Sequence, residues 1–316
     1  MDNLYLRGDI DMYHFIINPN SRSGLGLQVW NEVEAILKEK EVEYIPYFTK
    51  YQRHAIQIVN DITCDGEPHT LVVLGGDGTM GEVVTGIAYP DQVTIGYIPI
   101  GSGNDFARSL KISKDPAVAL QNILDSNTIK PLDVGVLEYK NKKRHFAVSS
   151  GIGVDAAVCH AVCVSKLKYI LNKLKLGKFT YALLTIDRLF NSKPDKMTLL
   201  LDEKKELSFD KVHLAAAMNQ PYQGGGCMFC PNAKSDDGTL DLIVIADIPK
   251  IMVLLILPTI FFGMHIYLKG VHIYRCKKVE ITSEIPLAVH SDGEPIFLQR
   301  NLTYSVEPSF AKIILP

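Results

Sequence analysis

Apolar runs recur at intervals over the first third of the chain. Residues 12–19 (MYHFIINP), 71–74 (LVVL) and 94–100 (TIGYIPI) are apolar enough to predict buried strands. Residues 44–48 (YIPYF) predict a further short strand, which Pro46 weakens or places at a sheet edge. The apolar pattern therefore predicts four strands in this part of the chain.

Amphipathic stretches between these runs predict helices. The apolar face of the first helix consists of Val29, Val33, Ile36 and Leu37, with Glu and Lys between them. Residues 54–62 and about 79–88 predict two more helices, and Asp115-Pro116 opens another as N-cap and first-turn proline. Strands that alternate with helices predict an α/β domain with a parallel, doubly wound sheet.

From Asp133 onward the chain consists of short apolar runs separated by polar turns. Strands are predicted at residues 133–139, 145–151, 196–202, 212–218, 239–247, 277–283, 287–292, 302–307 and 311–316. Residues 154–190 are predicted to be helical, with Gly177 as a break. This order of elements predicts a second, mostly antiparallel β domain with some helix.

One long apolar stretch, residues 251–268 (IMVLLILPTIFFGMHIYL), raises the question of a membrane span. It is only marginally long enough to cross a bilayer, and it contains Pro258, Gly263 and His265. We therefore favour a buried or surface-docked helix that is broken near Pro258.

Composition narrows the class of protein. The length of 316 residues suggests two domains. Lys and Arg number 33 and Asp and Glu 35, a balance that gives no basic excess and so argues against a nucleic-acid binder. The first fifteen residues lack the pattern of a signal peptide.

The cysteines predict reduced thiols. Six cysteines are too few for a disulfide scaffold in a chain of this length, which favours a cytosolic protein. Cys227 and Cys230 have zinc-ligand spacing, but a structural zinc needs four ligands. The other close pair, Cys159 and Cys163, lies in a predicted helix, so we favour buried thiols.

Three glycine-rich turns follow the predicted strands of the first domain. They are residues 18–26 (NPNSRSGLG), 75–81 (GGDGTMG) and 101–108 (GSGNDFAR). The carboxyl ends of parallel strands meet at one edge of a sheet, where glycines and helix N-termini suit phosphate. A carboxylate beside phosphate is unfavourable without a cation, so Asp77, and Asp105 on the next turn, predict Mg²⁺.

The sequence GGDGT, followed by PIGSGNDFAR, resembles the diacylglycerol-kinase catalytic domain family of soluble lipid kinases. That family shares its ATP-binding domain with the NAD kinases. Further similar motifs occur in the family's order at residues 132–135 (LDVG), 151–156 (GIGVDA), 222–242, 269–273 (KGVHI) and 291–295 (SDGEP). The resemblance implies a nucleotide-binding α/β domain over 1–131 and a β-sandwich-like lipid-substrate domain over 132–299. Residues of about 300–316 are expected to return to the first domain.

The resemblance also implies site residues. The nucleotide is expected near Asn18, Pro19, Asn20, Thr49, Gly75, Gly76, Asp77, Gly78, Thr79, Met80, Gly81, Ser102 and Asn104. An acidic network around a catalytic Mg²⁺ is expected to comprise Asp77, Asp105 and Asp133. A second, structural metal is expected at Asp237 and the carbonyls of Lys234 and Thr239, although Asp237-Gly238 also fits a plain hairpin turn.

The resemblance leaves two details open. Asp292 or Glu294 is expected to be the catalytic base, with Asp292 as the first choice. Many relatives have a lysine after the first loop's glycine, whereas Leu25 follows Gly24 here and Arg22 is the nearest basic residue. The cation that contacts phosphate is therefore not identified by the sequence.

The implied activity is that of an ATP-dependent lipid kinase, with diacylglycerol as the leading acceptor. A sphingoid base, a monoacylglycerol or a glycolipid is the alternative acceptor, and an NAD kinase is the alternative enzyme. A non-catalytic lipid sensor would be expected to lose Asp77, Asp292 or Glu294, and all three are present.

Membrane contact is expected to be peripheral, at the cytoplasmic face. The apolar residues 251–268 offer a surface for lipid tails. Residues 166–178 carry five lysines among apolar residues, which fits either a solvated helix face or attraction to anionic headgroups. A homodimer is left open.

Overall fold

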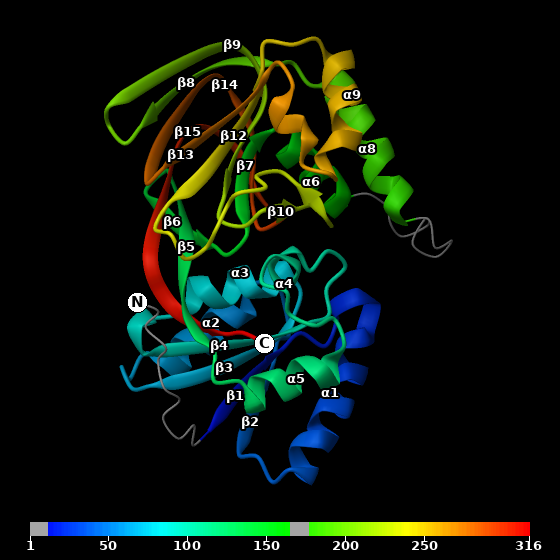
Figure 1. Ribbon diagram of the computed structural model, residues 1–316, viewed down its shortest axis with the longest axis vertical. Coiled ribbons are helices and arrows are strands. Elements are labelled where there is room, and N and C mark those ends of the chain that lie inside the picture. Colours follow the sequence, from blue (N-terminus) through cyan, green and yellow to red (C-terminus); the bar gives the residue numbers. More distant parts are fainter. Residues whose placement is uncertain (1–11, 165–176) are drawn as a thin grey trace.

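The computed structural model describes residues 12–164 and 177–316, which form two stacked domains (Figure 1). The first domain is built on a parallel sheet in the order β2-β1-β3-β4. Its strands are β1 (Tyr13–Ile17), β2 (Tyr44–Phe48), β3 (His69–Gly75) and β4 (Val93–Pro99). The strand that contains Pro46 lies at the edge, as its sequence predicted.

Helices cover both faces of this sheet. They are α1 (Ser21–Glu39), α2 (His54–Thr63), α3 (Asp77–Gly86), α4 (Asp105–Ser109) and α5 (Pro116–Asp125), with a short 3₁₀ turn η1 (Pro90–Gln92). In Figure 1, α1 and α5 lie below the sheet, and α2 and α3 lie above it. The predicted doubly wound α/β architecture is confirmed.

Two helices begin earlier than their apolar pattern indicated. Helix α1 starts at Ser21, inside the expected loop, because the Asn18 side chain accepts a hydrogen bond from the Asn20 amide (3.1 Å) and turns the chain. Helix α3 starts at Asp77 rather than Thr79. Helix α5 begins as predicted, since the Asp115 carboxylate accepts from the amides of Ala117 and Val118.

The second domain is mostly antiparallel. Its strands are β5 (Ile129–Tyr139), β6 (Lys142–Phe146), β7 (Ser149–Gly153), β8 (Asp195–Leu201), β9 (Lys205–Met218), β12 (Leu240–Ala246), β13 (Val271–Cys276), β14 (Lys278–Ser291) and β15 (Glu294–Ile314), with a small hairpin of β10 (Tyr222–Gln223) and β11 (Cys227–Met228). One apolar core fills the space between these strands, and a second separates them from the domain's helices. The β-sandwich-like fold is confirmed.

Strand β12 shows why its sequence is almost wholly apolar. Leu242 and Val244 point into the core between the strands, whereas Ile243 and Ile245 point into the core beneath the helices. A strand covered on both faces needs apolar residues at consecutive positions. The exception, Asp241, is buried, and its Oδ1 lies 3.5 Å from the Arg275 guanidinium.

The helices of this domain are α6 (Val154–Val164), α8 (Gly177–Asn191), α9 (Lys250–Ile260) and the 3₁₀ turn η2 (Met264–Tyr267). Residues 165–176, with most of the lysine-rich segment, lie outside the described residues. Helix α9 docks on the surface, as predicted. The predicted break falls slightly beyond Pro258, because the helix continues to Ile260 and Gly263 then adopts a left-handed conformation.

No helix in the described ranges is long and apolar enough to cross a membrane.

Strand β15 joins the two domains (Figure 1, red). The sequence predicted separate strands at 302–307 and 311–316, but the structure has one strand with an irregularity between Glu307 and Ala311. Its last residues pair with β4, and Phe310, Ala311, Ile313 and Ile314 contribute to the core of the first domain. The strands predicted at 277–283 and 287–292 are likewise one strand, β14.

Candidate active site

A cavity of about 410 Å³ opens at the carboxyl ends of β1 and β3, next to the turn between β14 and β15. Its lining consists of Asn18, Asn20, Ser21, Thr49, Lys50, Tyr51, Gln52, Gly76, Gly78, Thr79, Glu82 and Glu294. A hollow of about 500 Å³ on the far side of the second domain, beside the β5–β6 hairpin, contains no predicted site residue. The first cavity is therefore the candidate site.

Six residues predicted to surround the nucleotide meet in this cavity. The Asn18 side chain donates to the Thr79 hydroxyl (3.2 Å), and the Asn18 amide donates to the Leu74 carbonyl. These bonds hold the loop after β1 against the start of α3. Thr49 is fixed through its amide, which donates to the Ile17 carbonyl (2.8 Å). Asn20, Gly76 and Gly78 complete the set.

The glycines leave backbone amides open to a ligand. A Cβ on Gly101 would lie 2.6 Å from the Gly76 Cα, so the two loops touch only because both residues are glycine. A Cβ on Gly78 would meet only the Asp292 carbonyl oxygen, at 3.9 Å, so this position faces open space. The N-terminus of α3 thus presents amides and a positive dipole end to the cavity, which suits phosphate.

Other predicted nucleotide residues do not line the cavity. They are Pro19, Gly75, Asp77, Met80, Gly81, Ser102 and Asn104. Met80 is fully buried in the core of the first domain, so its side chain cannot contact a nucleotide. Gly81 packs against the Asp292 carboxylate instead.

Asp77 and Asp105 lie together beside the glycine turns. The Asp77 carboxylate accepts from the amides of Asp105 and Phe106 (both 3.0 Å) and so caps α4. Burial, followed by the charge of Asp105, raises the pKa of Asp77 to about 6. Burial also raises the pKa of Asp105, although the amide of Gly225 donates to its Oδ2 (2.6 Å) and opposes this shift.

The space between these two acids fits a divalent cation. A Cβ on Gly103 would lie 3.3 Å from the Asp77 Oδ2 and 3.4 Å from the Asp105 Oδ2, so glycine keeps this position clear. The Asp77 Oδ2 and the Asp105 Oδ2 each accept a hydrogen bond from one backbone amide and retain a lone pair. Two hard carboxylate oxygens that flank an open position are the donor type that Mg²⁺ prefers.

Asp133 forms no hydrogen bond with Asp77 or Asp105 among the described residues. Its carboxylate accepts from the amides of Gly238 and Ser309 (both 2.7 Å), and its own amide donates to the Ser235 carbonyl. Within residues 12–164 and 177–316 no three His, Cys, Asp or Glu side chains are placed to hold one metal. The three-acid network expected from the resemblance is therefore not assembled, because Asp133 joins loops of the two domains.

Asp292 is enclosed by backbone. Its Oδ1 accepts from the amides of Val148 and Ser149 and its Oδ2 from that of Ala147, at 2.8 to 3.0 Å. The absence of a side chain at Gly81 makes room for the Asp292 carboxylate, because a Cβ on Gly81 would lie 2.5 Å from the Asp292 Oδ2. Burial raises the pKa of Asp292 to about 6, with the three amides acting in the opposite direction.

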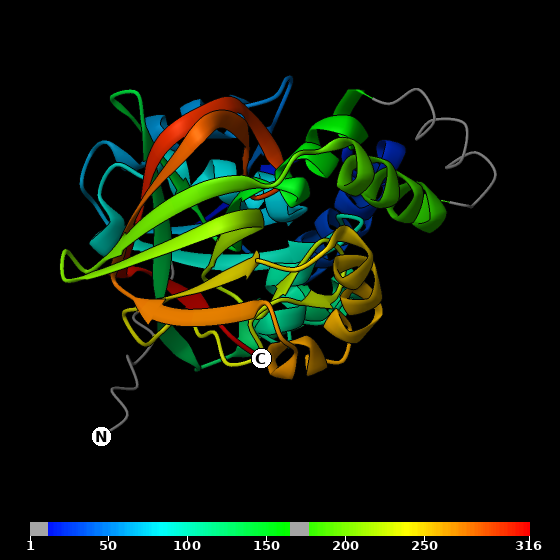
Figure 2. The same cartoon turned by 90° about the horizontal axis from the view of Figure 1, so that it is seen from above.

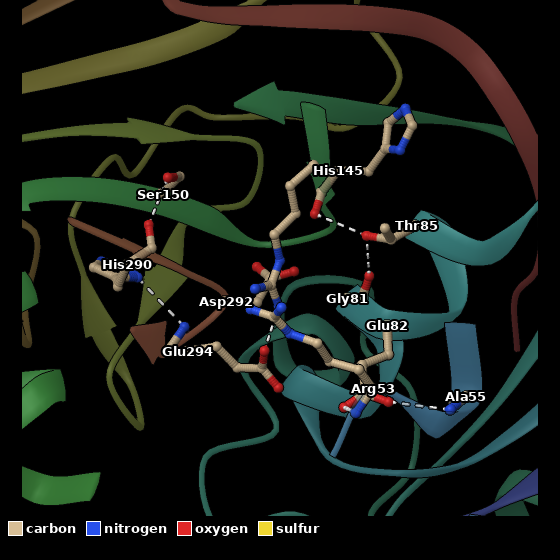
Figure 3. A network of polar contacts seen from close by, with 12 residues as sticks. Arg53, Ala55, Gly81, Glu82, Thr85, His145, Ser150, His290, Asp292 and Glu294 are labelled. Carbon is tan, nitrogen blue, oxygen red and sulfur yellow. Dashed lines mark hydrogen bonds and ion pairs between the residues drawn. The ribbon is translucent and has the colours of Figure 1, made fainter. Parts of the chain in front are cut away.

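Glu294 has a different environment, two residues along the same turn. Asp292 and Gly293 both have positive φ (47° and 78°), as a tight two-residue hairpin requires, and Glu294 begins β15. Glu294 lines the cavity, and Figure 3 shows it beside Asp292. Its carboxylate accepts a hydrogen bond from the Arg144 guanidinium. The two acids therefore do not point the same way, and Glu294 is the one that faces the candidate site.

Two contributors were missed by the sequence reasoning. Arg144 was assigned to a polar turn, yet it is buried, and its Nε and Nη1 have no hydrogen-bond partner among the described residues. Arg144 lies two residues before the buried Phe146, so in a strand both side chains are on the same face, and this periodicity could have revealed that Arg144 is buried. Glu82 accepts from the amides of Arg53 and Ala55 and joins α3 to the start of α2 (Figure 3).

The turn predicted to hold a second metal is closed on itself. The Asp237 Oδ1 accepts from both the amide and the hydroxyl of Thr239 (3.1 and 2.7 Å), and its Oδ2 lies 3.7 Å from Arg275. A metal at Asp237 and the Lys234 and Thr239 carbonyls stays a prediction.

No disulfide joins the six cysteines, all of which lie in the described residues, as predicted. The prediction that the two close pairs are buried holds for Cys230 only, because Cys159 and Cys227 are half-buried and Cys163 is exposed.

Comparison with known proteins identifies the family. Residues 12–137 match the model described as "Diacylglycerol kinase catalytic domain", and residues 147–315 match "YegS C-terminal NAD kinase beta sandwich-like domain". The chain belongs to the diacylglycerol kinase catalytic-domain family. The family and its named relatives support a lipid kinase in general and do not specify the acceptor.

Relatives cover nearly the whole chain. The Bacillus subtilis protein named "Putative lipid kinase YtlR" is 29% identical over 288 residues, 89% of this chain and 93% of that protein. A Mycobacterium tuberculosis protein named "Diacylglycerol kinase" is 28% identical over 293 residues, 91% of this chain and 90% of that protein. The crystal structure named "A putative diacylglycerol kinase from Bacillus anthracis str. Sterne" superposes with a TM-score of 0.78 at 24% identity, covering 98% of this chain and 99% of that one. This last likeness concerns the fold alone.

Proposed function

We propose that this lipid kinase transfers the γ-phosphoryl group of ATP to the hydroxyl of diacylglycerol, giving phosphatidic acid. The observation that carries the proposal is the position of Glu294, which lines the same cavity as the glycine-rich N-terminus of α3. One wall of the cavity is thus suited to phosphate, and the other carries a carboxylate that can accept a proton.

Different residues would bind the nucleotide and the metal. The amides around Gly76 and Gly78 bind the nucleotide phosphates, and Asn18, Asn20 and Thr49 shape the loops beside them. Asp77 and Asp105 would hold Mg²⁺, which offsets the charge of the transferring phosphoryl group when it is bound.

Glu294 is the base in this proposal, ahead of Asp292. The lipid oxygen forms a bond to the γ-phosphorus, the bond from that phosphorus to the bridging oxygen of ADP breaks, and the hydroxyl proton passes to the Glu294 carboxylate. The Asp292 carboxylate accepts three amides and does not line the cavity, so Asp292 fixes the turn that presents Glu294. Arg144 holds the Glu294 carboxylate in place.

The choice of diacylglycerol rests on the family and on the names of relatives, and the acceptor needs a direct test. We would supply radiolabelled ATP and Mg²⁺ with micelles of diacylglycerol, monoacylglycerol, a sphingoid base or a glycolipid, and in parallel with NAD. Label is expected in phosphatidic acid. Label in another lipid would change the acceptor, label in NADP would replace the lipid kinase by an NAD kinase, and no transfer would favour a lipid sensor.

We further propose a cytoplasmic enzyme that acts at the inner membrane face, because its donor is ATP and its six cysteines form no disulfide among the described residues.

A further inference from the structure

Helix α9 and turn η2 expose apolar side chains where a surface helix is ordinarily polar. Val253, Ile256 and Ile260 are buried against the second domain. The opposite side of the segment exposes Ile251, Met252, Leu255, Phe261, Phe262, Met264, Tyr267 and Leu268. Phe262 is 76% exposed and Tyr267 82% exposed. A helix that is apolar on all sides is normally buried, so the exposed side of this helix indicates a surface that binds another molecule or a membrane.

Helix α8 extends the same surface. Leu183, Ile186 and Phe190 recur at the spacing of one helix face and are exposed. The Lys250 ammonium donates to the Phe190 and Ser192 carbonyls, which joins the start of α9 to the end of α8. Figure 2 shows both helices on one side of the second domain. We call the exposed residues of α8, α9 and η2 together the apolar face.

The charges around the apolar face are basic. Residues 248–279 contain no Asp or Glu, and Lys250 and Lys269 stand at the two ends of the α9–η2 segment. Lys193, just beyond α8, is exposed. The one acid described on α8, Asp187, lies 3.3 Å from Arg188. An apolar surface with basic borders is complementary to a bilayer that carries anionic headgroups.

We propose that the apolar face docks on the surface of an anionic lipid bilayer, with the large side chains of η2 and α9 inserted at the headgroup level. The choice of a bilayer over a second copy of the chain rests on the basic borders and on the proposed lipid acceptor. Two copies of this face would bring like charges together, whereas a bilayer supplies opposite ones.

The apolar face is connected to the candidate site through one small hairpin. The buried His265 of η2 contacts the Phe229 carbonyl through Nε2 (2.9 Å), just beyond β11. The loop between β10 and β11 reaches the first domain, where the Gly225 amide donates to Asp105. Docking would therefore hold the membrane beside the element that borders the acidic site, which is a suitable place for a lipid acceptor to enter.

The test measures binding to vesicles, which does not depend on phosphoryl transfer. Vesicles of phosphatidylcholine with phosphatidylglycerol would be sedimented with the native protein and with a Phe262→Ser, Tyr267→Ser variant. Each lost side chain should weaken partition about tenfold, since burying a large apolar side chain has an effect of that order. Both residues are exposed, so the variant should fold normally, which thermal unfolding would check.

The matched control is Tyr89→Ser, which removes an exposed aromatic side chain (53%) from the first domain and should bind vesicles as the native protein does. Failure of the native protein to bind, or native-like binding by the double variant, would overturn the proposal. A native dimer that the double variant converts to monomers without loss of vesicle binding would assign the face to self-association. Transfer to a water-soluble, short-chain diacylglycerol tests the proposed function separately, and there the double variant should keep native turnover.

Discussion

The acids of the first-domain turns and the acids of the β14–β15 turn use backbone amides in different ways. Asp77 and Asp105 accept amides and yet flank a position that Gly103 keeps clear. In the second domain the structural role and the chemical role belong to different acids. Asp292 accepts hydrogen bonds from three backbone amides, whereas Glu294 accepts from Arg144 and from no backbone amide of the described residues. The contrast shows that an acid in a motif can be structural, chemical or both, and that the space its carboxylate faces beyond its amide partners decides which.

The Glu294→Gln variant should have the largest effect, and it tests whether Glu294 rather than Asp292 accepts the proton. If Glu294 alone accepts the proton, turnover should fall by about 10²–10⁴-fold, because amide nitrogen cannot take it. ATP affinity should change little, since the phosphates bind to the first domain's loops. Steady-state kinetics with diacylglycerol and ATP titration would measure both. Near-native turnover in this variant, with loss in a folded Asp292→Asn variant, would restore Asp292 as the base.

Asp292 should matter most for stability. Asp292→Ala leaves three buried amides without acceptors, which should lower the free energy of unfolding by about 3–5 kcal/mol. Asp292→Asn keeps one acceptor oxygen but places an NH₂ group against an amide, so a smaller loss is expected. Denaturant unfolding would measure these values. A native-like stability for Asp292→Ala would show that the amides find other partners and that the turn does not depend on this acid.

Gly78 and Gly81 offer a matched pair on α3. Gly78→Val should weaken ATP binding by about 10–100-fold, the effect of losing a charge-assisted hydrogen bond, while stability changes by less than about 1 kcal/mol. Gly81→Ala places a Cβ 2.5 Å from the Asp292 Oδ2 and should instead destabilise the fold by about 1–3 kcal/mol. Calorimetric titration and unfolding would separate the two effects. Native ATP binding by Gly78→Val would mean that phosphate binds elsewhere.

The most gradual expected effect is on the pH dependence of stability. Folding raises the pKa of Asp77 from 3.8 to about 6, so between these values the folded chain binds more protons than the unfolded one. Its contribution is complete below about pH 4 and is lost as the pH rises through 6, a change of about 3 kcal/mol for a shift from 3.8 to about 6. The unfolding free energy of Asp77→Asn should decline less over this window. Parallel curves for native and variant would show that Asp77 keeps an ordinary pKa.

Local signals in the sequence predicted the first domain well and the long strands less well. The alternation of apolar runs and amphipathic faces identified the parallel sheet, its edge strand and the helix that begins after Asp115. Strands β14 and β15 were predicted in pieces, because polar residues and irregular pairing interrupt the apolar pattern within a continuous strand.

The candidate site was predicted as a set of loops but not in its internal geometry. The glycines and Asn18 could be placed because strand ends in a parallel sheet converge. The enclosure of Asp292 and the pairing of Arg144 with Glu294 arise between segments about 145 and 150 residues apart. Spacing along the chain carries no information about such contacts.

The long strand β15 has a consequence for how the protein is made. The core of the first domain includes Phe310, Ala311, Ile313 and Ile314, and β4 pairs with Lys312 and Ile313. A chain emerging from the ribosome therefore cannot complete this domain until the second has been synthesised, and β4 keeps one edge unpaired until then. We expect the two domains to reach their native state together and the nascent chain to depend on chaperones while that edge is exposed.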